Sequence, residues 1–215
     1  MAIDQAIELA DHGLLFSHTN TCEERYNALA GQLQQHLAKY PTEYGVLAGD
    51  MFQVLFASRE RGDSKVFKCF LLEYRNKSGW KSKEIELPQS STVIAALGSG
   101  KPHFMKNYER YQAGLNNSTS RNVFHCFCDT IFSNADPLCG GAPQLVGLYR
   151  KPDSLPKQFG VIRNSCRYLN GMQITESPTF EGVEWRNDLF ERCDGRTMLR
   201  LQDAQPQPDN LRTST

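Results

Sequence analysis

The chain lacks an excess of charge of either sign, and it lacks any long apolar run. Its 215 residues include 24 basic and 24 acidic side chains, so the formal net charge is zero. A balanced surface of this kind does not attract nucleic acid or an anionic membrane, and we expect neither as a partner. No apolar run is long enough to span a bilayer. Residues 1–13 contain acids but no basic region of the secretory kind.

Motifs for cofactors and disulfide frameworks are also missing. The seven cysteines are odd in number and are spread along a chain too long to depend on disulfides. We therefore expect reduced thiols and a cytoplasmic location. Gly98-Ser99-Gly100-Lys101 lacks the glycine spacing and the Lys-Ser/Thr ending of a phosphate-binding loop. The sequence predicts no cofactor and no metal.

What is present is the composition of a globular protein, with 40% hydrophobic and 22% charged residues. The length fits one domain, which we place over residues 1–175. An appendage over residues 176–215 differs in composition. Its aromatic part, Phe180 to Phe190, contains Trp185 and is expected to dock on the domain. Its end, Gln205 to Thr215, is polar and proline-containing and is expected to be disordered.

The first half of the chain begins with local signals for a hairpin and two helices. Short apolar runs on both sides of Asp11-His12-Gly13 predict a hairpin over Ile7–Ser17. Thr21 is a good N-cap for a helix that extends to Tyr40. A second helix is predicted over Thr42–Ala57, although its apolar positions are irregularly spaced. The strands predicted next are Val66–Tyr74, Trp80–Leu87 and Thr92–Leu97.

The second half repeats a pair of helices and then returns to strands. Apolar residues recur at helical spacing over Lys101–Leu115 and Ser120–Ala135. Antiparallel strands with helices in consecutive pairs predict an α+β protein with helices on the outer faces of two packed sheets. The remaining predicted strands are Leu145–Tyr149, Phe159–Ile162 and Tyr168–Ile174.

Two motifs in this order of elements resemble a known family. Gly98-Ser99-Gly100 follows a predicted strand, and Asp136-Pro137-Leu138-Cys139-Gly140-Gly141 ends a predicted helix; residues 100–135, 36 positions, lie between Ser99 and Asp136. The pattern is similar to that of proteasome β subunits and their bacterial relatives among the N-terminal-nucleophile (Ntn) hydrolases. The resemblance covers roughly Ile7 to Ile174. It implies an αββα four-layer sandwich of antiparallel sheets, here lacking its first hairpin.

The resemblance also implies a peptidase or amidohydrolase that assembles as a homo-oligomer or with related subunits. Its supporting residues would be Ser99, Asp136 and Cys139, which hydrogen-bond around the nucleophile's amine. Cys139 stands where the family has serine, and a thiol is the poorer hydrogen-bonding group. The resemblance names no residues that bind substrate. The geometric expectation is that the three side chains converge.

The family's nucleophile is an N-terminal Thr, Ser or Cys, and this chain begins Met1-Ala2. The first predicted hairpin resembles the family's third and fourth strands, so we expect the chain as it stands to be inactive. A start codon assigned too far downstream is one explanation. A natural non-catalytic relative, used for assembly or for ligand binding in the cleft near Ser99, is the other.

Each candidate residue also has a plain structural interpretation. Ser99 is a turn residue, Asp136 can initiate the turn before Pro137, and Cys139 is a small residue beside two glycines. A Ser99-His103-Asp136 triad lacks the nucleophile-elbow pattern. The nearby group of His125, Cys126 and Cys128 invites a zinc site, but core packing is favoured because positions two apart on a helix do not face each other.

Overall fold

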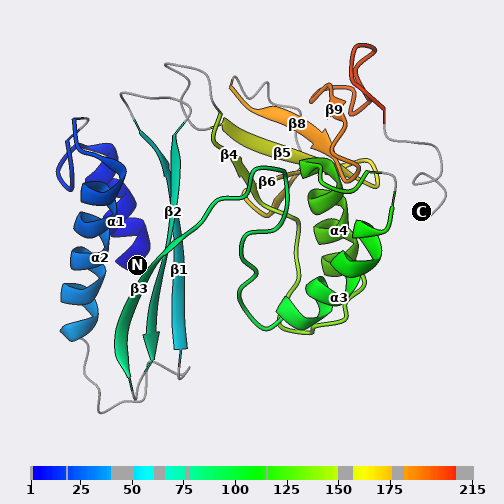
Figure 1. The fold of residues 1–215 in the computed structure, drawn as a ribbon. Helices are drawn as coiled ribbons and strands as arrows, with labels where there is room; N and C mark the ends of the chain where they lie inside the picture. The colour runs from blue at the N-terminus through cyan, green and yellow to red at the C-terminus, as the bar shows by residue number, and fades with distance from the viewer. Residues whose placement is uncertain are drawn as a thin grey trace. The chain divides into compact units, whose positions relative to one another are not determined.

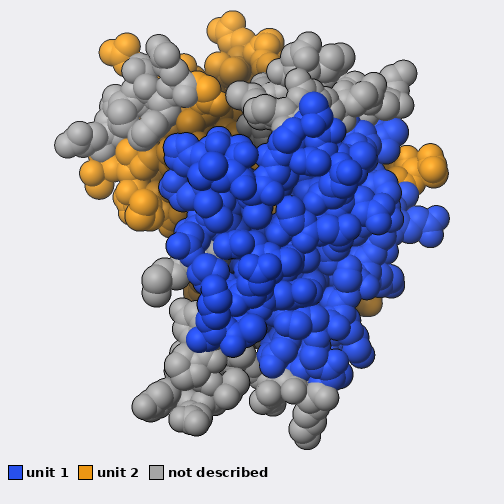
Figure 2. All heavy atoms as spheres, turned by 90° about the vertical axis from the view of Figure 1, so that its left-hand side faces the viewer, with its two compact units in different colours: residues 1–87, 150–153 blue, residues 88–149, 154–215 orange. Residues whose placement is uncertain are grey.

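A computed structural model describes residues 2–17, 19–39, 51–60, 66–75, 78–114, 116–149, 157–175 and 182–206. They form two compact units, each with its own helices and sheet (Figures 1 and 2). Unit 1 is Met1–Leu87 with Arg150–Asp153, and unit 2 is Pro88–Tyr149 with Ser154–Thr215. This division differs from the expected one into residues 1–175 and 176–215. Within the described residues the protein is α+β, with four helices, a three-stranded antiparallel sheet and a six-stranded mixed sheet.

Unit 1 combines two helices with a sheet in which sequential strands are neighbours, in the order β1-β2-β3. Both strand pairs are antiparallel, and β1 pairs with β2 along its whole length. The elements are α1 (Ala2–Asp11), α2 (Cys22–Ala38), β1 (Met51–Arg59), β2 (Phe67–Arg75) and β3 (Gly79–Ile85).

The hairpin predicted over Ile7–Ser17 is wrong, because the chain forms helix α1 there. The apolar residues of α1 recur at helical spacing, and Ala6 is fully buried. Gly13 has φ +67°, and the Leu14 N–H donates to the Leu9 carbonyl at 2.8 Å. This geometry is a Schellman ending of a helix. A glycine with positive φ serves a hairpin turn and a helix end equally well, which is why the local signal misled.

Helix α2 confirms the helix predicted from Thr21. The Thr21 side chain accepts a hydrogen bond from the Glu24 N–H, and the Glu24 side chain accepts one from the Thr21 N–H, which makes a capping box. Its buried face packs on the sheet, where the ring of Tyr26 stacks on Phe70 with centroids 4.4 Å apart. Leu33, 1% exposed, lies in the same cluster.

The helix predicted over Thr42–Ala57 is wrong where it can be compared. Residues 42–50 lie outside the described residues, and from Met51 the chain is strand β1. Val54 and Phe56 alternate toward the core under α2, whereas Leu55 lies on the other face. Apolar residues that alternate with a period of two are typical of a strand. Pairing of β1 with β2 stabilises the strand. Strands β2 and β3 confirm the two strands predicted around the turn at residue 78.

Unit 2 is built on a sheet with neighbours β7-β6-β5-β8-β9, and β4 also pairs with β5. Strand β8 runs parallel to β5, and the other pairs are antiparallel. The two predicted helices are present, and the three strands predicted over residues 145–174 correspond to β4, β5 and the β6-β7 hairpin, with shifted ends. Strands β8 and β9 were not predicted. The elements are α3 (Lys101–Gln112), α4 (Ser120–Phe132), β4 (Leu145–Gly147), β5 (Lys157–Arg163), β6 (Cys166–Leu169), β7 (Met172–Ile174), β8 (Glu184–Asn187) and β9 (Arg192–Cys193).

The strand predicted over Thr92–Leu97 is wrong, because this segment belongs to no strand or helix. Its backbone forms no hydrogen bond with another described backbone group. The segment is tied instead through the Thr92 hydroxyl, which lies 3.0 Å from the Tyr108 hydroxyl on α3. Apolar residues alone do not make a strand when no neighbouring strand pairs with them.

The aromatic segment around Trp185 docks as predicted. Strand β8 pairs with β5, and Trp185 is 7% exposed. Its ring lies where two glycines leave room: a Cβ on Gly160 would lie 2.3 Å from the ring, and one on Gly195 would lie 2.2 Å from its Nε1. Helix α4 covers the same sheet, with Phe124 and Cys128 packed against Val161. No helix within the described ranges is both long and apolar enough to cross a membrane.

Candidate functional site

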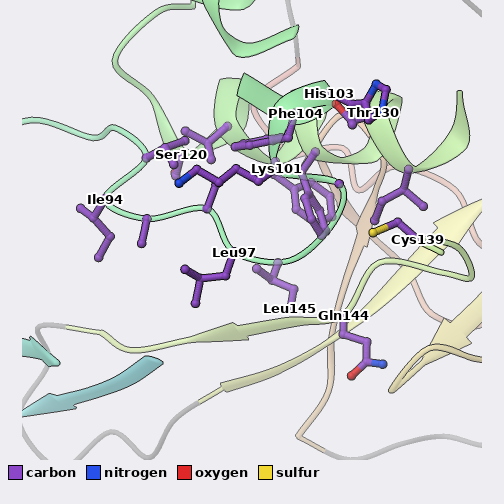
Figure 3. A pocket seen from close by; sticks show the side chains of 18 of the residues that line it. Ile94, Leu97, Lys101, His103, Phe104, Ser120, Thr130, Cys139, Gln144 and Leu145 are labelled. Carbon is purple, nitrogen blue, oxygen red and sulfur yellow. The ribbon is translucent and has the colours of Figure 1, made fainter. Parts of the chain in front are cut away.

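Unit 2 contains a cavity of about 630 Å³ between the segment of residues 91–97 and helices α3 and α4 (Figure 3). Cavities of roughly 300–1,000 Å³ are typical of small-molecule sites. The wall is mostly apolar, and the rings of Phe104 and Phe127 meet edge to face there, 6.1 Å apart. The main apolar residues of the wall are Ala95, Leu97, Phe104, Phe127, Ile131 and Leu145.

The cavity exists because residues 92–97 do not form the predicted strand. Successive residues of an extended chain point to opposite sides, so a strand that offers one face contributes alternate residues. Here all seven residues from Ser91 to Leu97 line the cavity. The edge of this segment therefore forms one side of the cavity. No described side chain of unit 2 fills the space beside the segment.

Ser99, Asp136 and Cys139 come together, and the last two line the cavity. Ser99 Oγ lies 3.6 Å from Cys139 Sγ. Gly100 packs against the same group, since a Cβ there would lie 2.9 Å from Cys139 Sγ and 3.6 Å from Asp136 Oδ2. Residues 40 positions apart in sequence thus share one site. The convergence matches the geometric expectation, whereas a catalytic role for the three residues stays a prediction.

Local turns place the three side chains. Gly98 has φ +85°, a conformation that favours glycine and that turns the chain into α3. The Leu138 N–H donates to Asp136 Oδ1 at 2.9 Å, and the Cys139 N–H donates to the Asp136 carbonyl at 3.1 Å. Asp136 is therefore also the turn residue of its structural interpretation. In this turn Oδ1 of Asp136 accepts the hydrogen bond, so the other carboxylate oxygen, Oδ2, is left for the site.

The pKa of Asp136 lies below the usual value for an aspartate. The neighbouring Ser99 hydroxyl is the largest cause, followed by the Leu138 N–H, and the Cys139 thiol and the charge of His103 lower the pKa further. Oδ2 of Asp136 is itself buried, and no described donor reaches it with good hydrogen-bond geometry. The Ser99 hydroxyl and the Cys139 thiol are the side-chain donors that favour the charged carboxylate. A buried oxygen of a charged carboxylate remains open to a donor from a bound molecule.

His103 lines the cavity but does not complete a Ser-His-Asp triad. No hydrogen bond joins His103 to Ser99 or to Asp136 within the described part of the chain. A triad needs the histidine between the hydroxyl and the carboxylate. Here Ser99 adjoins Asp136 directly, and His103 acts on the carboxylate only through its charge.

His125, Cys126 and Cys128 are buried in unit 2 rather than arranged around a metal. Burial raises the pKa of Cys126 to about 11 and also raises that of Cys128. His125 Nε2 lies 3.7 Å from Asp129, which in turn accepts a hydrogen bond from Tyr111. The described ranges contain no group of three or more potential metal ligands. The i, i+4 spacing of His125 and Asp129 is the sequence signal for this polar pair.

Lys101 also lines the cavity, although it was not among the residues predicted for the site. It begins α3 directly after the Gly-Ser-Gly motif, and its position there was its only signal. Comparisons of the chain with models of protein families, with curated proteins and with solved structures find no match.

Proposed function

We propose that the chain is a relative of the proteasome-type Ntn hydrolases, and that unit 2 carries the supporting part of their amide-hydrolysing site. One observation carries the proposal. A buried, unfilled oxygen of Asp136 lies beside Ser99 and Cys139, at an apolar cavity. The Gly-Ser-Gly and Asp-x-x-Cys-Gly-Gly motifs contain these three residues.

The chemistry fits an amine that binds at the open oxygen. In an N-terminal nucleophile, the side chain attacks the amide while the residue's own amine takes the proton. The Asp136 carboxylate would accept a hydrogen bond from that amine and stabilise its protonated form. The Ser99 hydroxyl and the Cys139 thiol would complete the polar environment. The adjoining cavity would hold an apolar part of the substrate.

The finer fold expectation, a four-layer sandwich, belongs to the same proposal. Each unit supplies a sheet with a helix on one face, since α2 packs on β2 and α4 packs on β5. The three-stranded sheet also carries apolar residues on the face away from α2, where Leu55 pairs with Leu71 and Ala57 with Cys69. The same face also carries charged residues such as Glu73, so it is only partly apolar. A further layer over its apolar part is what the proposed four-layer sandwich would add.

A small molecule that mimics the nucleophilic residue tests the proposal. Threoninamide carries the amine and the hydroxyl of an N-terminal threonine. Titrated at millimolar concentration into the ¹⁵N-labelled chain, it should shift the amide signals of Ser99, Asp136 and Cys139. The variant Asp136→Asn should lose the response, and Asp129→Asn, a carboxylate on α4 outside the cavity lining, should keep it.

Two results would contradict this proposal. One is the absence of any site-specific shift at high threoninamide concentration. The other is hydrolysis of an amide substrate by the purified chain alone that Ser99→Ala or Cys139→Ala abolishes, because that would assign the attack to an internal nucleophile.

Binding without catalysis is the second candidate function, and the apolar wall of the cavity favours it. Such a wall provides affinity for an apolar ligand through burial of its surface, with no need for a nucleophile. The two functions make different predictions for Asp136→Asn. The substitution should remove amine binding in the first case and should leave binding of an apolar ligand intact in the second.

A further inference from the structure

The segment of residues 91–97 has the sequence of a strand but pairs with no strand. Three β-branched residues, Thr92, Val93 and Ile94, favour an extended chain, and the apolar Ala95 to Leu97 follow them. No residue of the segment has a positive φ. Its backbone N–H and C=O groups form no hydrogen bond within the described part of the chain. A segment whose local signals disagree with the fold around it is commonly a functional site.

This segment is accessible and borders the apolar cavity. Ser91, Thr92 and Ile94 are exposed, Ile94 at 41%, and the other four residues are half-buried. All seven line the cavity, and the opposite wall carries apolar side chains of α3 and α4 such as Phe104 and Phe127. Backbone groups without partners thus lie beside a space that apolar side chains can enter.

From these observations we propose that residues 92–97 are a docking site for an extended segment of another polypeptide. The partner pairs its backbone with this segment and places apolar side chains in the cavity. The hydrogen-bonding groups fix the chemistry of the partner, because a peptide backbone repeats an N–H and a C=O at the spacing of a strand. Main-chain pairing supplies affinity, and the cavity selects the side chains.

The size of the site limits the partner segment. Six residues span about 20 Å when extended, so a partner of about five or six residues pairs along the whole site. The site shares the cavity with the proposed function, but strand pairing needs neither Asp136 nor a nucleophile.

Strand pairing has a period that the filling of the cavity by a small apolar molecule lacks. Successive residues of a strand direct their N–H and C=O groups to opposite edges. Every second residue of the bound peptide therefore bonds to residues 92–97, and the residues between them do not. The same rule gives Ala95 and Ala96 opposite roles on the protein side.

An uncharged pentapeptide of alternating threonine and valine, acetylated and amidated at its ends, is the probe. Two matched forms carry two N-methyl groups each, one on both valines and the other on the second and third threonines. Titrated into the ¹⁵N-labelled full chain, the parent peptide should shift the amide signals of residues 92–97. One N-methylated form should bind roughly tenfold more weakly, because it loses two hydrogen bonds, and the other should stay within about threefold of the parent.

Ala95→Pro and Ala96→Pro are a matched pair of variants. Neither removes a hydrogen bond of the free chain, because no described group accepts one from either N–H. One of the two should weaken the parent peptide roughly threefold to tenfold, and the other should weaken it less. An unchanged NMR spectrum outside residues 91–100 would show that both variants are folded.

The proposal is overturned if the parent peptide does not bind, or if the two N-methylated forms bind alike. Slow hydrogen exchange at residues 92–97 without peptide would also overturn it, because the chain itself would then supply the pairing strand. Asp136→Asn should leave binding of the peptide within about twofold. Loss of the threoninamide response with retained alternation between the N-methylated forms would reject the hydrolase site and keep the docking site, and the reverse pair of results would do the opposite.

Discussion

Unit 1 and unit 2 each pack one helix on a sheet and a second helix on the first, but they build the sheet in different ways. In unit 1 each strand pairs with the next one along the chain. In unit 2 the central strand β5 also pairs in parallel with β8, which comes after two other strands. Neighbouring strands can be recognised from local signals, whereas the pairing of β5 with β8 depends on the whole unit.

The two units also differ in how tightly their helices and sheets fit. In unit 1 an aromatic cluster around Tyr26 and Phe70 fills the space under α2. In unit 2 the segment of residues 91–97 leaves a cavity beside α3 and α4, and charged groups line it. Aromatic residues thus pack together under the helix of unit 1, whereas a cavity lies beside the helices of unit 2. One tryptophan lies in each unit, Trp80 and Trp185, so labelling with 5-fluorotryptophan gives one ¹⁹F signal from each.

The largest expected effect is the loss of a packed side chain in unit 1. Leu33 is 1% exposed under α2. Leu33→Ala should lower the free energy of unfolding by about 2–5 kcal/mol, because it removes buried surface and leaves a cavity. Urea titration should move the ¹⁹F transition of Trp80 more than that of Trp185. The control Gln35→Ala, at an exposed position of the same helix, should move neither. Equal shifts of both signals would show that the two units unfold as one.

A smaller loss is expected in unit 2 from overpacking. Gly160→Ala would place a Cβ 2.3 Å from the Trp185 ring, so the ring must move. We expect destabilisation of about 1–3 kcal/mol and a changed Trp185 signal, with the Trp80 signal unaffected. Gly140→Ala is the matched control, because a Cβ there meets no atom within 4 Å. A Gly160→Ala protein as stable as Gly140→Ala would mean that Trp185 does not pack on this glycine.

The helix caps should give similar, modest effects in the two units. Thr21 caps α2 and Thr119 caps α4, each through its side-chain oxygen. Either threonine replaced by alanine should cost about 1 kcal/mol in urea denaturation. The loss at Thr21 should be the larger of the two, because Glu24 completes a capping box there. A greater loss at Thr119 would indicate that α4 depends on its cap more than the packing of unit 2 implies.

The smallest expected effects on stability come from two carboxylates whose pKa is lowered in the folded protein. The pKa of Glu24 in unit 1 is lowered by the Thr21 N–H and the Asn20 side chain, and that of Asp136 chiefly by Ser99. A lowered pKa in the folded state contributes stability above the usual carboxyl range, and this contribution is lost as pH falls through the lowered pKa, below about pH 4. Followed by NMR, Ser99→Ala should raise the pKa of Asp136 and leave that of Glu24 unchanged. An unchanged pKa of Asp136 would show that Ser99 does not act on it.

The elements predicted correctly from the sequence are those that depend on local signals. Helices α2, α3 and α4 were predicted because caps and apolar spacing are local. The hairpin expected at Ile7 failed because Gly13 serves helix ends and turns alike. The strand expected over Thr92–Leu97 failed because strand formation needs a partner, and no sequence signal gives the partner. The helix expected from Thr42 failed from Met51 onward, where pairing with β2 decides the structure.

The sequence by itself determined which residues are candidates for the site: the two glycine-containing motifs name Ser99, Asp136 and Cys139, because turns and helix ends depend on a few neighbouring residues. Only the tertiary structure decided that these residues meet, that Oδ2 of Asp136 is buried without a donor, and that a cavity adjoins them. The reason is physical. Burial, cavity shape and unfilled hydrogen-bonding capacity come from segments far apart in the chain, and their free energies appear only when those segments are packed together.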